Sequence, residues 1–238
     1  MRVTWDSPVT SQRPLLKYAL TAGFAAGLIV GGFHNLLSVP VIEEAIAFEE
    51  AQAAVGHAEE PLVSLGAQRV GLLLGQAIFG VIIGALFAGL YALALKALRG
   101  RGPRVVAAVT GLAGFWAVAL LPALKYSPNP PGVGETETLL FRQGFQLLFL
   151  VASFAALAAL LAVSKRAWHP GAVAAYLAVL GALFIALPAH PDSVSIPATL
   201  LREFRVLSVA GHLLLWLLIA ASVPWLARRS MPADDAPP

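Results

Sequence analysis

Cysteine is absent from the 238 residues, and charged side chains make up only 12% of the chain. Without thiols the protein forms neither disulfides nor thiolate metal sites, so histidine and the carboxylates remain as its strong metal ligands. The sequence also lacks a G-x-x-x-x-G-K-[S/T] loop, which excludes a P-loop nucleotide site. Soluble domains average about 25% charged residues, so this chain is poorly suited to water on all sides.

Hydrophobic residues, by contrast, make up 58% of the sequence, and the mean hydropathy is +0.78. Six hydrophobic runs approach the length of about 20 residues with which a helix crosses a bilayer. We therefore predict an all-α integral membrane protein with six transmembrane helices arranged as three outward hairpins. Residues 1–230 form the membrane domain, and the Pro/Asp/Ala-rich tail 231–238 is expected to be disordered. The predicted spans are 15–37, 70–95, 105–124, 145–163, 171–187 and 206–226.

The distribution of Lys and Arg predicts the orientation of these spans. With both termini in the cytoplasm, eleven of the sixteen Lys and Arg residues lie on the inner side, and ten of the thirteen acids lie on the outer side. This positive-inside bias predicts a multi-pass protein surrounded by bilayer lipid. It also explains the basic pI of about 9.5 without a nucleic-acid partner, because the positive charges are those that the topology requires.

Glycine recurs at four-residue spacing in the first two predicted spans. Small residues at that spacing let two helix backbones approach closely. The pattern predicts tight packing of these spans against each other or against a partner helix. Prolines also recur, near the outer end of each outward-running span, at Pro40, Pro122 and Pro188. The glycine series are Gly23/Gly27/Gly31, Gly71/Gly75 and Gly80/Gly84.

Six carboxylates and two imidazoles are concentrated in the segment 33–60, between the first two spans. Both groups donate lone pairs to hard or borderline divalent metals. Near the outer ends of two spans, His34 and His212 share a depth of roughly 9 Å, at 1.5 Å per helical residue. Four of the five histidines belong to the outer half of the protein. The residues predicted as metal ligands are His34, Glu43, Glu44, His57, His212 and His190.

Other interpretations fit the same residues. An acidic run is commonly a solvated surface helix, and a histidine inside a membrane commonly forms a hydrogen bond to a neighbouring helix. The concentration of histidine on the outer half favours the metal interpretation over these two. Protons compete with a metal for imidazole, so the predicted binding weakens as the pH falls through about 6.5.

The stretch 124–138 reads LKYSPNPPGVGETET. It resembles the signature loop of the CbtA family, the predicted cobalt transporter subunits, and the segments 33–44 and 204–216 are similar to that family too. Ser127 departs from the family pattern, in which proline tends to follow Lys-Tyr directly. The resemblance implies a bacterial inner-membrane protein that imports cobalt, often beside CbtB, a small single-span partner that carries histidines.

The leading interpretation is a non-enzymatic permease component whose substrate is a divalent transition-metal ion, with Co²⁺ implied by the resemblance. The usual affinity order favours copper and nickel over cobalt, so the residues alone do not select the metal. A second interpretation is a haem-binding membrane oxidoreductase with His34 and His212 as axial ligands. A third is a non-catalytic scaffold that packs partner helices on its glycine stripes.

Overall fold

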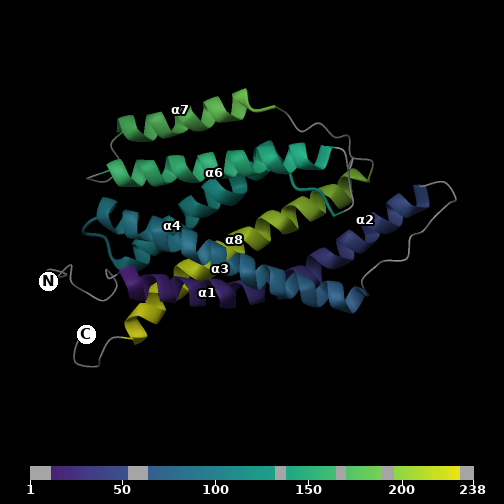
Figure 1. The fold of residues 1–238 in the computed structure, drawn as a ribbon, viewed down its shortest axis with the longest axis horizontal. Coiled ribbons are helices and arrows are strands. Elements are labelled where there is room, and N and C mark those ends of the chain that lie inside the picture. Colours follow the sequence, from purple (N-terminus) through teal and green to yellow (C-terminus); the bar gives the residue numbers. More distant parts are fainter. Residues whose placement is uncertain (1–11, 53–63, 132–137, 165–169, 189–195, 231–238) are drawn as a thin grey trace.

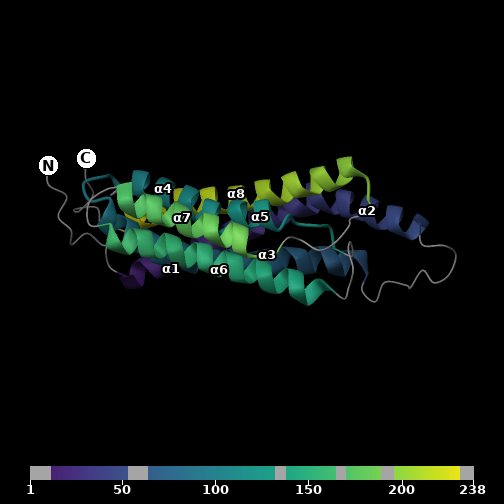
Figure 2. The same ribbon diagram turned by 90° about the horizontal axis from the view of Figure 1, so that it is seen from above.

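The computed structural model describes residues 12–52, 64–131, 138–164, 170–188 and 196–230. Every regular element in these ranges is a helix, and the helices share a common long axis (Figure 1; Figure 2). The all-helical class predicted from the sequence is confirmed. Helices long and apolar enough to cross a membrane lie at Pro14–Phe48, Leu65–Ala97, Pro103–Lys125, Gln143–Val163 and Ala198–Arg229.

The first membrane helix does not end where its hydrophobic run ends. It starts as α1 (Gln12–Phe33), passes through a π-helical turn, η1 (His34–Ser38), and continues as α2 (Val39–Gln52). The acidic segment after residue 37 is therefore helical at least as far as Gln52, because Glu and Ala favour helix and Pro40 is accommodated. Figure 1 shows α2 extending beyond the other helices.

Two π turns occupy equivalent places in the first and third membrane helices. The second, η2 (Trp116–Leu120), joins α4 (Pro103–Phe115) to α5 (Leu121–Lys125). In each turn the residue before a proline donates its N–H to the carbonyl five residues back, Val39 to His34 and Leu121 to Trp116. Proline lacks an N–H, and its ring collides with the carbonyl four residues back in an α-helix. A wider turn relieves that collision and lets the helix continue.

Glycine allows α1 and α3 (Leu65–Ala97) to touch along their backbones. A Cβ placed on Gly23 would lie 2.9 Å from the carbonyl carbon of Gly80, and one on Gly27 would lie 2.8 Å from the Cα of Ala77. Real Cβ atoms essentially never approach other atoms so closely, so these positions accept only glycine. The four-residue series of the first span, which Gly31 completes against the side chain of Leu73, thus lies on α3 rather than on an open surface.

Gly71 and Gly75 lie outside this contact, so the predicted packing of the first two spans against each other does not involve them, and packing of these two glycines against a partner helix stays a prediction. A Cβ on either one would meet no heavy atom within 4 Å. The residues of α3 that face α1 include Gln76, Gly80 and Gly84. The line through Gly71 and Gly75 is displaced from that face by one residue, which is about 100° around a helix.

The remaining helices are α6 (Leu139–Val163), α7 (Pro170–Ala186) and α8 (Ala198–Arg229). The predicted fifth span corresponds to α7, whose 17 residues measure about 26 Å, somewhat less than the roughly 30 Å hydrocarbon core. Its neighbour is α6, and α8 crosses the middle of the bundle (Figure 1). Helix α8 begins at Ala198, well before the predicted start at residue 206. The prediction was late because Arg202 and Arg205 lower the hydropathy of the first turns of the helix.

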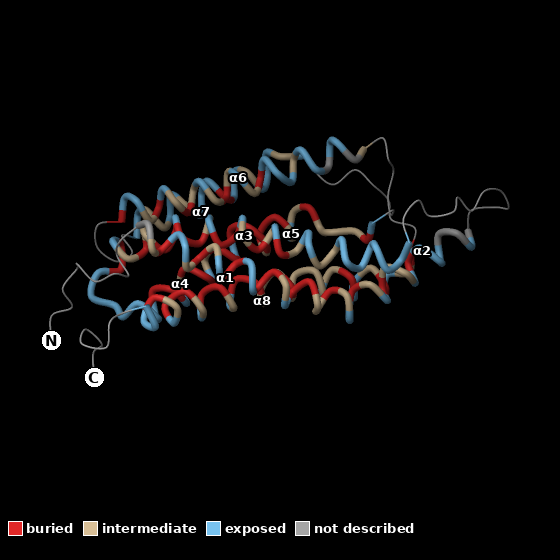
Figure 3. Tube along the Cα trace, turned by 60° about the horizontal axis from the view of Figure 1, so that its bottom comes forward, coloured by how far each residue is buried: buried red, intermediate tan, exposed pale blue. Residues whose placement is uncertain are grey.

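The core forms where α1, α3, α4 and α8 meet (Figure 3). Its largest buried side chain is Trp216 of α8, whose ring fills the space beside Gly114 of α4. Phe87 and Tyr91 of α3 stack next to it, with ring centroids 5.5 Å apart. The Tyr91 hydroxyl donates a hydrogen bond of 3.0 Å to the carbonyl of Pro103. This core fixes α8 against α1, which places the histidines described next.

Candidate metal site

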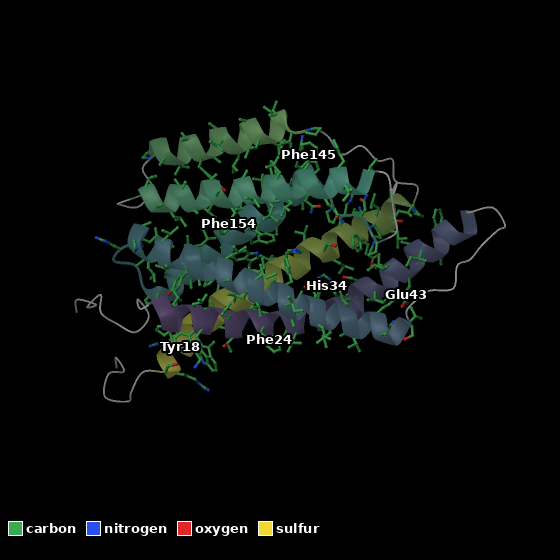
Figure 4. All side chains as sticks on the ribbon, in the orientation of Figure 1. Tyr18, Phe24, His34, Glu43, Phe145 and Phe154 are labelled. Atoms are coloured by element: carbon green, nitrogen blue, oxygen red, sulfur yellow. The ribbon has the colours of Figure 1, made fainter. Side chains whose placement is uncertain are left out.

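His34 is the first residue of the η1 turn and is buried inside the bundle (Figure 4). Its Nδ1 forms a hydrogen bond of 2.7 Å with the hydroxyl of Ser38, four residues further along. On the other side of the ring, Nε2 and Cε1 are the atoms closest to Gly211 of α8. The π turn and the serine therefore hold the imidazole with its Nε2 edge directed at α8.

His212 follows Gly211 on α8, and its ring is held in one tautomer. Its Nδ1 lies 2.9 Å from the carbonyl oxygen of Ser208, and a carbonyl only accepts, so Nδ1 carries the proton and donates it. The lone pair on Nε2 is then available to a metal, and metal-binding histidines typically have this second hydrogen bond. Phe79 of α3 contacts the ring edge-on, with centroids 5.6 Å apart.

The structure brings His34 and His212 together from opposite ends of the sequence. The His34 ring lies against Gly211, and His212 is the next residue of α8. Glycine at position 211 permits this approach, because a Cβ there would collide with the ring of His34. Imidazole nitrogen is a good ligand for the later divalent transition metals, so the pair has the chemistry of a small metal site.

The predicted carboxylates are placed differently. Figure 4 shows Glu43 nearer the end of the bundle than His34, and its Oε1 forms an ion pair of 3.1 Å with Arg69 of α3. Glu44 is exposed. Among the residues that the structure describes, no three or more His, Asp or Glu side chains are grouped to hold a metal ion. The described geometry therefore offers two imidazoles without a carboxylate beside them.

Two further predicted ligands, His57 and His190, lie outside the described residues. Their role as ligands stays a prediction. Glu59 and Glu60 of the same acidic segment also lie outside the described residues, whereas Glu49 and Glu50 belong to α2 by their backbone.

Asn35 was not singled out in the sequence, yet it links the histidine turn to the ion pair. Its Nδ2 donates to the carbonyls of Gly31 at 3.0 Å and of Arg69 at 3.2 Å. Its Oδ1 is buried and accepts no hydrogen bond from the described residues. Ser38 was missed as well, although its position four residues after His34 places it on the same helix face. These residues make the surroundings of His34 more polar than its sequence neighbours indicate.

The proline-rich loop after α5 is anchored by two other parts of the chain. The buried Tyr126 donates its hydroxyl to the carbonyl of Pro188 at 2.9 Å. Arg205 of α8 donates to the carbonyl of Pro128 at 3.1 Å and to Oδ1 of Asn129 at 3.0 Å. Burial raises the pKa of the Tyr126 hydroxyl, so it stays protonated and continues to donate at neutral pH. The described part of the loop is thus bound to α8.

A family model described as probable cobalt transporter subunit (CbtA) matches residues 12–228. The chain belongs to the CbtA family. The match includes the η1 turn, the proline-rich loop and nearly all of α8, so the resemblance seen in the sequence is confirmed. Comparisons with curated proteins and with solved structures gave no match.

Membership of the CbtA family also indicates a partner and a place in the membrane. The family is described as a transporter subunit, and a subunit implies at least one partner. The apolar helices and the family together indicate a multi-pass membrane protein of cobalt transport.

Proposed function

We propose that this CbtA-family chain is the permease component of an uptake system for a divalent transition-metal ion, with Co²⁺ as the substrate, in the bacterial inner membrane. The observation that carries the proposal is the placement of His34 within the helical bundle against Gly211 of α8, one residue before His212. Polar side chains inside a membrane cost free energy, so they are rare unless they have a partner or a function.

The hydrogen bonds of the two histidines favour a function in ion binding over one in helix packing. Each Nδ1 is paired with a group on its own helix, His34 with Ser38 and His212 with Ser208. Neither of these bonds joins one helix to another, which is what a histidine that holds helices together would do. Both Nδ1 atoms are thus occupied locally, and the Nε2 atoms are the ones left to bind a ligand.

Two imidazoles leave most coordination positions of a metal ion to water or to other groups. A transport site must bind its ion well enough to admit it and weakly enough to release it. Two protein ligands suit that requirement better than a closed site of four. A histidine-bearing partner of the CbtB type is the protein that we propose for supplying further ligands.

The haem interpretation does not fit this geometry. Two axial histidines bind opposite faces of the macrocycle, so their rings must stand apart with the flat ring system between them, whereas the Nε2 edge of His34 packs against the backbone of Gly211, next to His212. The scaffold interpretation loses part of its support, because Gly23 and Gly27 are already covered by α3, whereas Gly71 and Gly75 meet no other part of the described chain.

Cobalt accumulation in cells tests the proposed function directly. In a bacterial strain without other cobalt importers, expression of the chain together with its partner should raise the uptake of Co²⁺ severalfold. The measurement is cell-associated cobalt after a short exposure, with a strain that carries the empty vector as control. Equal cobalt in both strains would refute the permease proposal.

We propose that both termini face the cytoplasm, as the charge distribution predicts. Successive membrane segments alternate in direction, so the start of α1 and the end of α8 lie at the same end of the bundle (Figure 1). That end carries only basic residues among the described charged side chains, whereas the described acids lie on α2 and at the start of α8. The basic residues at that end are Lys17, Lys96, Arg99, Arg101, Arg104, Arg228 and Arg229.

Single cysteines should report this topology, because the chain has no cysteine of its own. Ala51 on α2 and Arg101 between α3 and α4 are both exposed. In intact cells an impermeant thiol reagent should label Ala51→Cys and leave Arg101→Cys unlabelled until the membrane is opened. The reverse pattern would invert the orientation, and labelling of both would contradict the hairpin arrangement.

A further inference from the structure

A groove of about 620 Å³ runs between α5 and the first half of α8, and neither His34 nor His212 lines it. Apolar side chains form most of its walls, among them Leu124, Val209 and Leu213. The charged groups Arg202 and Arg205 stand toward the end where α8 begins. The groove is therefore amphipathic, with an apolar body and a cationic end.

The length of the groove matches one leaflet of a bilayer. Its lining along α8 extends from Ala198 to Leu213, which at 1.5 Å per residue is about 22 Å. Half of a bilayer with its headgroup layer measures about 20–22 Å. A transmembrane helix of a partner would need a groove through both leaflets, whereas a lipid needs only one.

The cationic end of the groove carries an arginine without an ion-pair partner in the described ranges. Within the described ranges no hydrogen bond or ion pair joins Arg202 to another residue, and the only ion pair there is the one between Glu43 and Arg69. Glu203 is exposed next to it in sequence and does not neutralise it. Arg205, by contrast, is held in place by the proline-rich loop. An anion at this end would meet one free guanidinium and one fixed guanidinium.

We propose that this groove binds one anionic glycerophospholipid. An acyl chain lies along Leu124, Val209 and Leu213, and the phosphate is bound by Arg202 with Arg205 behind it. A guanidinium presents its N–H donors in a fork that fits two phosphate oxygens, which makes arginine well suited to this contact. The lipid would thereby rest on the loop that Arg205 anchors.

Counting bound lipid on the purified full chain tests the proposal. Native mass spectrometry in a mild detergent should show one phospholipid per chain in the wild type after washing. Arg202→Gln should weaken its retention about tenfold, the effect of losing one charge-assisted hydrogen bond. Ala210→Trp should block retention, because the indole occupies the groove. The controls are Arg104→Gln, an exposed arginine at the other end, and Leu177→Trp on the exposed surface of α7.

Further measurements identify the molecule that fills the groove, and a second variant allows for misfolding of the first. Millimolar inorganic phosphate should leave the lipid bound, because it lacks the acyl chain; displacement by phosphate alone would show an anion site and overturn the proposal. A wild type that dimerises and becomes monomeric in Ala210→Trp would show that a second copy fills the groove. If Ala210→Trp does not fold, Val206→Trp, at the exposed rim, replaces it. The assignment is also refuted if the lipid is retained in Arg202→Gln and in the folded tryptophan variant, or if the controls lose it to the same extent.

Discussion

Replacing Gly80 by alanine should prevent α1 and α3 from reaching their native contact. A Cβ on Gly80 would lie 2.9 Å from the Cα of Gly27 and 3.0 Å from the carbonyl carbon of Gly23. These are backbone atoms, which cannot rotate away as a side chain can. Overpacking with adjustable side chains costs about 1–3 kcal/mol, so here we expect about 3 kcal/mol or more. Thermal unfolding in detergent should show Tm lowered by about 6–12 °C.

The matched control is Gly75→Ala, five residues earlier on the same helix. A Cβ on Gly75 meets no heavy atom within 4 Å, and alanine has the higher helix propensity. Its Tm should stay within about 2 °C of the wild type or rise slightly. Equal losses at Gly80 and Gly75 would show that the tight contact is not what these glycines provide.

Co²⁺ binding should weaken at least about tenfold when either His34 or His212 is replaced by alanine. Changes to groups that merely orient a metal ligand already cost about 10–100-fold in affinity, and these changes remove a ligand itself. Ser38→Ala, which removes the hydrogen bond to His34 Nδ1, should give a smaller loss. Isothermal titration calorimetry on purified protein measures all of these affinities, and cobalt uptake in cells provides a second readout.

Glu203→Gln is the control for charge, because Glu203 is an exposed acid on α8 that belongs to neither the histidine pair nor the groove. If both histidines bind one ion, the double variant should be little weaker than either single variant, since residues that share a site are not additive. Histidine variants that bind Co²⁺ as Glu203→Gln does would show that the pair is not a metal site. A failure confined to this experiment would leave the lipid groove untouched, because that groove does not involve His34 or His212.

The glycine pattern shows how far local sequence carries a packing prediction. Four-residue spacing identifies Gly23 and Gly27 as a surface that another helix can approach, because the period is a property of one helix. It cannot select the partner residues, since Gly71/Gly75 and Gly80/Gly84 have the same spacing. Which pair meets α1 depends on the rotation and axial position of α3, and the structure places Gly80 and Gly84 there.

The proposed metal site shows the same limit for function. Composition singles out His34 and His212, because imidazoles are costly inside a membrane wherever they occur. It does not show that Gly211 lets the His34 ring lie against α8 beside His212, that Ser38 and Ser208 occupy the Nδ1 atoms, or that Glu43 is paired with Arg69. The contact of His34 with Gly211 and the ion pair of Glu43 with Arg69 join residues far apart in the chain. The bond from His34 to Ser38 lies in a π turn whose register depends on how the helix accommodates Pro40.

The sequence by itself therefore determined the all-helical membrane class, the charge asymmetry and the family. Hydropathy, charge and sequence motifs are properties of each segment and do not depend on how the helices pack. The tertiary structure alone decided which glycines touch, that His34 packs against Gly211 beside His212, and where an amphipathic groove opens beside α8. Each of these depends on the relative rotation of two helices, and a turn of about 100° per residue means that a shift by one position exchanges one face for another.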